Sequence, residues 1–150
     1  MPNGILTFTL TSAEATAKLA ATIAGKLASG DVILLSGNVG AGKTHFARSL
    51  IQSWLGYAED VPSPTFTLVQ PYVVEGAEIW HADLYRLTST QEIEELGLVS
   101  AFESEICLVE WPDRLGDLAP TDALHLTLND GPDAASRILS AQWVDARWDA

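Results

Sequence analysis

The fold of this chain is decided by one stretch of sequence, Val32-Ile33-Leu34-Leu35-Ser36-Gly37-Asn38-Val39-Gly40-Ala41-Gly42-Lys43-Thr44. Its first four residues are apolar and predict a buried strand, and the amphipathic residues from Thr44 to about Leu55 predict a helix. Between them, residues 37–44 match a phosphate-binding loop, whose glycines let backbone N–H groups surround phosphate oxygens at a helix N-terminus. Lys43 would reach the β- and γ-phosphates, and the Thr44 hydroxyl would bind Mg²⁺. The sequence therefore predicts a nucleoside triphosphate site.

Length and composition predict one domain over residues 1–150, because the chain has 150 residues and is 47% hydrophobic. No apolar run approaches the roughly 20 residues that span a bilayer. The first residues, Met1 to Gly4, lack the basic start and apolar core of a secretory signal. Cys107 lies in an apolar run, where a buried thiol is the expected state. We therefore expect a cytoplasmic protein without disulfides.

The charge balance is strongly acidic, with 8 basic against 20 acidic side chains and a net charge of −12. Tight, independent binding to nucleic acid normally uses clustered lysines and arginines, which this chain does not have. If nucleic acid is involved, a basic partner protein is expected to make most of the contacts. The alternative is that the acidity serves only solubility.

The remaining patterns predict the order βαβα, followed by strands with few helices between them. Strands are expected at 5–10, 31–36, 66–74, 77–82, 106–111, 123–128 and 137–144, helices at 13–27, 44–55, 90–96 and 98–103, and a turn-rich connection at 112–120. The fully apolar strand that leads into the loop is expected at the centre of the sheet. This order fits an α/β class, a three-layer P-loop NTPase-like domain. Its sheet is expected to be mixed, because the hairpins near 66–82 and 123–144 add antiparallel pairing.

Two carboxylates follow predicted strands and are candidates for positioning the metal. Asp83 closes the strand 77–82 and would hold Mg²⁺ directly or through water, opposite Thr44. Glu110 ends the next buried strand and would orient the attacking water or bind the metal. The alternatives are a turn aspartate and an ordinary strand-end glutamate. His81 would help to arrange the Asp83 loop, or it is a histidine with its hydrogen bonds satisfied at a strand end.

Ser63-Pro64-Thr65-Phe66 has the pattern of a switch segment. Its prolines favour a stiff, extended loop, from which the Thr65 hydroxyl could reach the γ-phosphate or Mg²⁺. The alternative is a proline turn with Phe66 as a core residue. Trp111, next to Glu110, would cover the nucleotide or contact a partner, and a half-buried structural tryptophan is the competing interpretation.

Three sets of site residues follow from these interpretations. The catalytic set is Lys43, Asp83 and Glu110, and the metal set is Thr44, Asp83 and Glu110. No separate catalytic role is assigned to His45 or His125. The nucleotide-binding set is Gly37, Asn38, Val39, Gly40, Ala41, Gly42, Lys43, Thr44, His45, Thr65 and Trp111.

Four motifs together resemble the TsaE (YjeE) family of small bacterial ATPases. They are the loop at 37–44, Ser63-Pro64-Thr65-Phe66-Thr67, His81-Ala82-Asp83-Leu84-Tyr85-Arg86-Leu87 and Val109-Glu110-Trp111-Pro112. The first is shared with very many proteins, whereas the HxDxYR segment followed by Glu-Trp is far more specific. The resemblance covers about residues 5 to 115, and no motif is recognised after Pro120.

The resemblance implies an ATP-binding and hydrolysing accessory protein with ATP and Mg²⁺ as ligands. The family acts with a TsaD–TsaB complex in forming N6-threonylcarbamoyladenosine at position 37 of ANN-decoding tRNAs, so tRNA would be met indirectly. Lys43 and Thr44 would bind ATP and Mg²⁺, Asp83 would be a magnesium ligand, Thr65 would lie in the switch loop, and Glu110 and Trp111 would flank the site. Two other functions stay open: a small-molecule P-loop kinase, which would need an arginine-rich lid, and a nucleotide-dependent binding module without catalysis.

Overall fold

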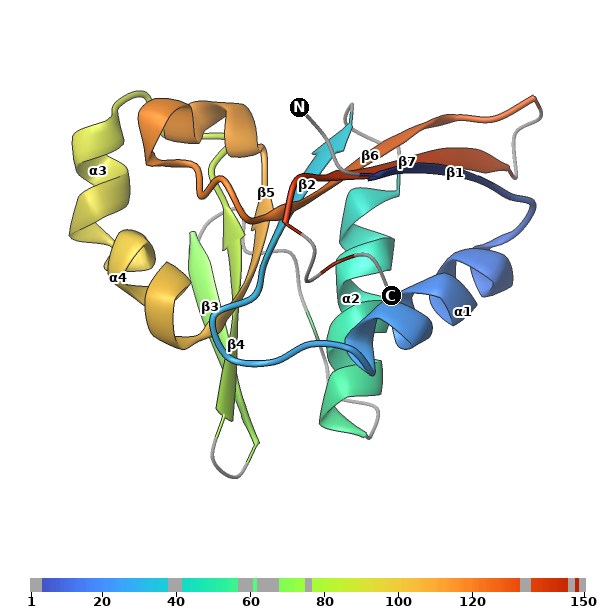
Figure 1. The fold of residues 1–150 in the computed structure, drawn as a ribbon, viewed down its shortest axis with the longest axis horizontal. Helices are drawn as coiled ribbons and strands as arrows, with labels where there is room; N and C mark the ends of the chain where they lie inside the picture. The colour runs from blue at the N-terminus through green and yellow to red at the C-terminus, as the bar shows by residue number, and fades with distance from the viewer. Residues whose placement is uncertain are drawn as a thin grey trace.

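The computed structural model describes residues 4–37, 42–56, 61, 68–74, 77–132, 136–145 and 148. The chain begins with the expected order βαβα and continues with strands that have fewer helices between them (Figure 1). The strands are β1 (Gly4–Leu10), β2 (Val32–Gly37), β3 (Val69–Val74), β4 (Ala77–Asp83), β5 (Ile106–Glu110), β6 (Leu124–Asp130) and β7 (Arg137–Trp143). The helices are α1 (Ala13–Ala24), α2 (Lys43–Leu55), α3 (Thr90–Glu95), α4 (Leu98–Ser104) and the 3₁₀ helix η1 (Pro112–Leu118).

The described strands form one seven-stranded sheet in the order β1-β7-β6-β2-β5-β4-β3. The inner strands β6, β2, β5 and β4 pair in parallel. Antiparallel strands extend both edges, β3 beside β4 on one side and β7 and then β1 on the other. The expected α/β class with a mixed sheet and hairpin additions is confirmed, and β2 is central as its apolar sequence predicts.

The sheet is the middle of three layers, with α1 and α2 on one face and α3, α4 and η1 on the other (Figure 1). Alternation along β2 shows why both faces are covered. Ile33 and Leu35 belong to the core under α1 and α2, whereas Val32 and Leu34 belong to the core under α3 and α4. A strand that is apolar on both faces must be buried on both.

Local sequence sets the ends of the two longer helices. The Ser12 side chain accepts a hydrogen bond from the Ala15 N–H at 3.1 Å and so caps α1. At the other end α1 stops at Ala24, three residues before the expected Leu27, because Leu27 N–H bonds to the carbonyl of Ala24 and tightens the last turn. Helix α2 ends at Gly56, which adopts a left-handed φ of 85°.

The structure differs from the sequence prediction after β5. Trp111 was expected to continue the strand, but it adopts a φ of 59° and ends β5 at Glu110. The expected turn-rich connection is the 3₁₀ helix η1, which begins at Pro112, where the fixed φ of proline suits a first helical position. Gly116, with φ 53° and ψ −126°, interrupts that helix. The predicted switch segment and the turn at 75–76 lie outside the described residues.

Among the residues that the structure describes, no helix combines the length and the apolar character that crossing a membrane requires.

Candidate nucleotide-binding site

Three parallel strands, β2, β4 and β5, end at the same edge of the sheet with Gly37, Asp83 and Glu110. Asp83 lies directly opposite Glu110 in the β4–β5 register, and Leu35 lies opposite Glu110 in the β2–β5 register. Because side chains alternate along a strand, Glu110 is on the same face as Leu108, which packs in the layer of α1 and α2. The two carboxylates that the sequence selects therefore lie side by side, facing the layer that contains α2.

Lys43 begins α2 immediately after Gly42, whose φ of 98° favours a residue without a side chain. The Lys43 side chain is 5% exposed, and its ammonium donates a hydrogen bond to the Gly37 carbonyl. Burial lowers the pKa of Lys43 from its ordinary value, and the negative charges of Glu110, Asp83 and Asp113 oppose that shift. The lysine is thus a buried ammonium whose charge is stabilised electrostatically by both strand-end carboxylates.

Asp83 is 5% exposed and shapes the chain that follows it. Its Oδ1 accepts a hydrogen bond from the Tyr85 N–H at 2.9 Å, which fixes the turn after β4. Its own N–H donates to the carbonyl of Leu68 at 2.9 Å. Leu68, which follows the predicted switch segment in the chain, is thus bonded to the strand that carries Asp83.

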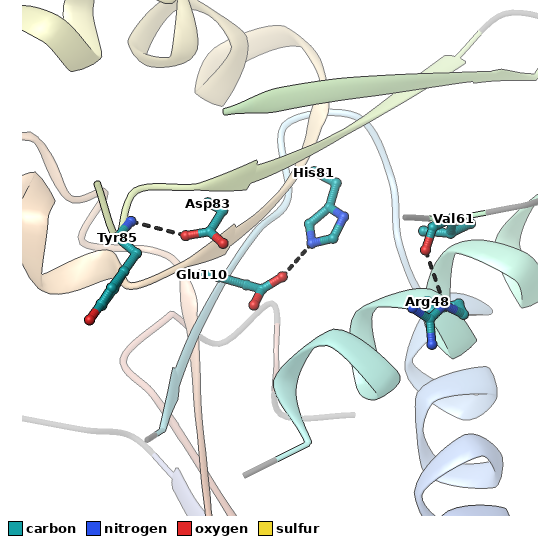
Figure 2. A network of polar contacts seen from close by, with 6 residues as sticks. All are labelled: Arg48, Val61, His81, Asp83, Tyr85 and Glu110. Atoms are coloured by element: carbon teal, nitrogen blue, oxygen red, sulfur yellow. Dashed lines mark hydrogen bonds and ion pairs between the residues drawn. The ribbon is translucent and has the colours of Figure 1, made fainter. Parts of the chain in front are cut away.

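Glu110 is 2% exposed, and its Oε2 lies 2.6 Å from Nε2 of His81 on the neighbouring strand (Figure 2). Leu84 N–H donates to the backbone carbonyl of Glu110 at 3.1 Å. Glu110 is therefore held through both its backbone and its side chain at the end of β5.

Trp111 covers the lysine from the η1 side of the site. The Lys43 ammonium lies 3.5 Å from the centroid of the Trp111 ring, a cation–π contact. The Tyr85 ring packs on Trp111 with centroids 4.7 Å apart and an interplanar angle of 50°. The left-handed backbone of Trp111, uncommon for a bulky residue, turns the chain at this point. The aromatic pair thus joins the strand ends to the start of α2.

The other predicted site residues divide into two groups. Gly42, Lys43 and Thr44 are at the start of α2, and Thr44 is half-buried. His45 is turned toward α1, with its Nε2 3.1 Å from the Ala13 carbonyl oxygen. The predictions for Asn38, Val39, Gly40, Ala41 and Thr65 fall on residues outside the described part of the chain.

Sequence reasoning missed one basic residue at this site. Arg137 begins β7, and its Nε lies 3.9 Å from the position that a Cβ on Gly42 would occupy. Its guanidinium also donates to the Ser136 carbonyl at 2.8 Å. The only signal in the sequence that could have pointed to Arg137 is the small number of basic residues. No local pattern marks it, because its proximity to Gly42 depends on how the C-terminal hairpin joins the sheet.

The donor set suits Mg²⁺. Magnesium is usually held by one or two carboxylates together with substrate phosphates and water, and Asp83 and Glu110 supply two adjacent carboxylates. In the described residues no group of three or more His, Cys, Asp or Glu side chains could hold a metal ion.

Comparison with known proteins identifies the family. Residues 10–138 match the family model of threonylcarbamoyl adenosine biosynthesis protein TsaE. The tRNA threonylcarbamoyladenosine biosynthesis protein TsaE of Rickettsia conorii is 41% identical over 120 residues, which are 80% of this chain and 69% of that protein. The Bacillus subtilis protein of the same name is 37% identical over 116 residues, 77% of this chain and 70% of that protein.

A solved structure agrees with the sequence relatives. The crystal structure of Bacillus subtilis YdiB superimposes with a TM-score of 0.80 at 26% identity, covering 99% of this chain and 91% of that one. The resemblance drawn from the four motifs is therefore confirmed over most of the chain. This chain belongs to the TsaE family, which takes part in the biosynthesis of threonylcarbamoyladenosine in tRNA.

Proposed function

We propose that this chain, as a single cytoplasmic domain, binds and hydrolyses ATP with Mg²⁺ in support of threonylcarbamoyladenosine formation at position 37 of ANN-decoding tRNAs. It acts through a TsaD–TsaB complex and meets tRNA only through that complex. The observation that supports the proposal is the convergence of Lys43, Asp83 and Glu110 at the carboxyl ends of neighbouring parallel strands. Ligands of open α/β sheets bind at that edge.

The chemistry assigned to the chain is in-line attack of water on the γ-phosphate of ATP. The buried ammonium of Lys43 stabilises the negative charge that develops on the phosphate oxygens, and it is effective because its surroundings exclude water. Glu110 orients the attacking water from the end of β5. Trp111 covers the phosphate side of the site.

Thr44, Asp83 and Glu110 are the residues that would hold Mg²⁺, which supplies further charge neutralisation when it is bound. The predicted backbone donors at 37–44 and the Thr65 hydroxyl complete the proposed nucleotide site. The net charge of −12 supports an indirect role toward tRNA, since a polyanion would be repelled by the surface of this chain.

The experiment that tests the proposal is titration calorimetry with ATP and Mg²⁺, followed by steady-state hydrolysis alone and with a TsaD–TsaB pair. The wild-type chain is expected to bind ATP and to hydrolyse it faster with the pair. Lys43→Ala is expected to lose both binding and turnover, whereas Lys18→Ala, which removes an exposed lysine on α1, serves as the charge-matched control.

Each contrary result points to a different alternative. Absence of ATP binding by the wild-type chain contradicts the proposal as a whole. Binding without turnover, with or without the pair, leaves a nucleotide-dependent binding module. A pull-down of TsaD–TsaB with and without ATP then shows whether the nucleotide controls assembly.

A further inference from the structure

His81 is placed to act on Glu110 and on no other described polar group. It lies on β4 two residues before Asp83, its side chain is 0% exposed, and its ring points at the Glu110 carboxylate (Figure 2). Its neighbour in the β4–β5 register is Leu108, so the contact with Glu110 is the diagonal one, two residues further along β5. The pair therefore joins two strands just inside the edge where the nucleotide is proposed to bind.

The hydrogen bond between these residues uses one nitrogen of the ring. A carboxylate oxygen accepts hydrogen bonds, so Nε2 of His81 is assigned as the donor to Oε2 of Glu110 over 2.6 Å. The other ring nitrogen, Nδ1, is buried and has no hydrogen-bond partner among the described residues. All the hydrogen bonding of this ring in the described structure is thus directed to Glu110.

A merely space-filling residue at this position would be apolar. A buried ring nitrogen without a partner costs free energy that a phenylalanine or leucine would not incur. A buried glutamate without a donor would cost more, because its charge would be desolvated and unpaired. The presence of a histidine at position 81 is therefore explained by its hydrogen bond to the Glu110 carboxylate and not by hydrophobic packing.

We propose that His81 is a positioning residue, which holds one oxygen of Glu110 and leaves the other, Oε1, in a fixed orientation toward the phosphate side of the site. This inference rests on the proposed function, because the orientation matters for hydrolysis only if ATP is the substrate. Glutamate has three side-chain torsions, and a hydrogen bond to one oxygen removes most of that freedom before substrate arrives. Such supporting contacts typically change activity by about 10- to 100-fold.

The test compares two substitutions that differ in one property. His81→Phe keeps the ring and removes the donor, whereas His81→Gln keeps an N–H donor of similar reach. We expect His81→Phe to lower kcat for ATP hydrolysis by about 10- to 100-fold with the ADP Kd changed less than about threefold, and His81→Gln to recover most of the loss. Equal loss in both variants, or a wild-type rate in His81→Phe, would overturn the assignment.

A double-mutant cycle shows whether the effect passes through Glu110. In a Glu110→Gln background, His81→Phe is expected to reduce turnover no further, because the side chain that it positions is already disabled. A further loss of the same size as in the wild-type background contradicts the proposal. If His81→Phe does not fold, His81→Asn replaces it, since its shorter amide does not reach Oε2.

A readout without nucleotide separates this inference from the proposed function. Crystal structures of the nucleotide-free wild type, His81→Gln and His81→Phe are compared for the Glu110 side chain. We expect one orientation in the first two and a changed or multiple orientation in the third. An unchanged orientation in His81→Phe rejects the positioning role even if ATP is hydrolysed. A changed orientation in a protein that never hydrolyses ATP supports the positioning role and rejects only the proposed function.

Discussion

Asp83 and Glu110 place two negative charges side by side at the end of β4 and β5, and the consequence for nucleotide binding depends on the metal. In the proposed site these carboxylates would repel the triphosphate of ATP without Mg²⁺ and would bind it through the metal when Mg²⁺ is present. Lys43 offsets part of this charge but is itself partly compensated by its neighbours. The proposed function therefore predicts that single substitutions at these positions change the metal dependence of ATP affinity.

Asp83→Asn tests this directly, because the amide oxygen can still accept the hydrogen bond from the Tyr85 N–H that shapes the turn. With Mg²⁺ we expect ATP affinity to fall by about tenfold or more. With EDTA we expect it to stay the same or rise, since a repulsive charge is gone. Calorimetric titrations in both conditions check the sign, and a similar loss of affinity in EDTA would show that the aspartate does not act through the metal.

Arg137 contributes positive charge from the opposite end of the sequence. Its Nε lies beside Gly42, the residue before the proposed phosphate-binding lysine. Hydrogen bonds to charged groups contribute about 1.5–3 kcal/mol, so we expect Arg137→Gln to raise the ATP Kd by about tenfold or more. Lys18→Gln, which removes the same charge from an exposed position on α1, is the matched control. Equal affinities of the two variants would show that only the net charge of the chain matters.

The backbone dihedral angles of two glycines explain how helices α1 and α2 end. Gly56 ends α2 with φ 85°, and a Cβ added there would meet nothing within 4 Å. Gly25 follows α1 with φ −66°, and its added Cβ would be 3.7 Å from the nearest atom, which is ordinary contact. The two glycines differ in dihedral angle and not in crowding.

Alanine at each position is therefore expected to act in opposite directions. Gly56→Ala forces a left-handed alanine and should destabilise the protein by about 1 kcal/mol. Gly25→Ala reduces the freedom of the unfolded chain and should stabilise it by about 0.4–1 kcal/mol. Urea denaturation of both variants measures the difference. Changes of the same sign would mean that the two helices do not end as described.

Periodicity predicted most elements because this signal is local. Ser12 and Ser89 cap α1 and α3 immediately before the expected helix starts at 13 and 90, and Gly56 follows the last residue of α2. The element that sequence reasoning missed is η1. Its residues contain proline, glycine and aspartate, which are typical of turns, and its helical form depends on Trp111 reversing the backbone at the end of β5.

For the whole molecule, the sequence predicts which segments are strands better than it predicts the order of those strands in the sheet. The apolar sequence of β2 indicated a central position, and the strand ends indicated that Asp83 and Glu110 meet. The pairing of β1 with β7 was not predicted, because it joins the two ends of the chain and has no local signal. The pairing of β6 with β2 is also long-range, and it brings the hairpin that carries Arg137 to Gly42, which is why this part of the site could not be found from motifs.

Cys107 is a buried thiol, and its reactivity tests whether the core of the sheet is folded. It lies on β5 between Val32 of β2 and Trp80 of β4, is 0% exposed, and belongs to the core under α3 and α4. Burial, with a smaller contribution from Glu105, raises the pKa of its thiol from 9.0 to about 12. We therefore expect no reaction with an aromatic disulfide reagent at pH 8 in the native state and rapid reaction of one thiol in urea.

The same raised pKa makes stability depend on pH. Above about pH 9 the unfolded thiol loses its proton while the folded thiol keeps it, so the folded state binds more protons and stability falls as pH rises toward 12. The contribution of Cys107 is about 1.4 kcal/mol per pH unit within that window. Urea denaturation at pH 8, 9.5 and 10.5 should give a steeper loss for the wild type than for Cys107→Ala, in which the other titrating groups are unchanged. Parallel curves for the two proteins would mean that the centre of the sheet admits water.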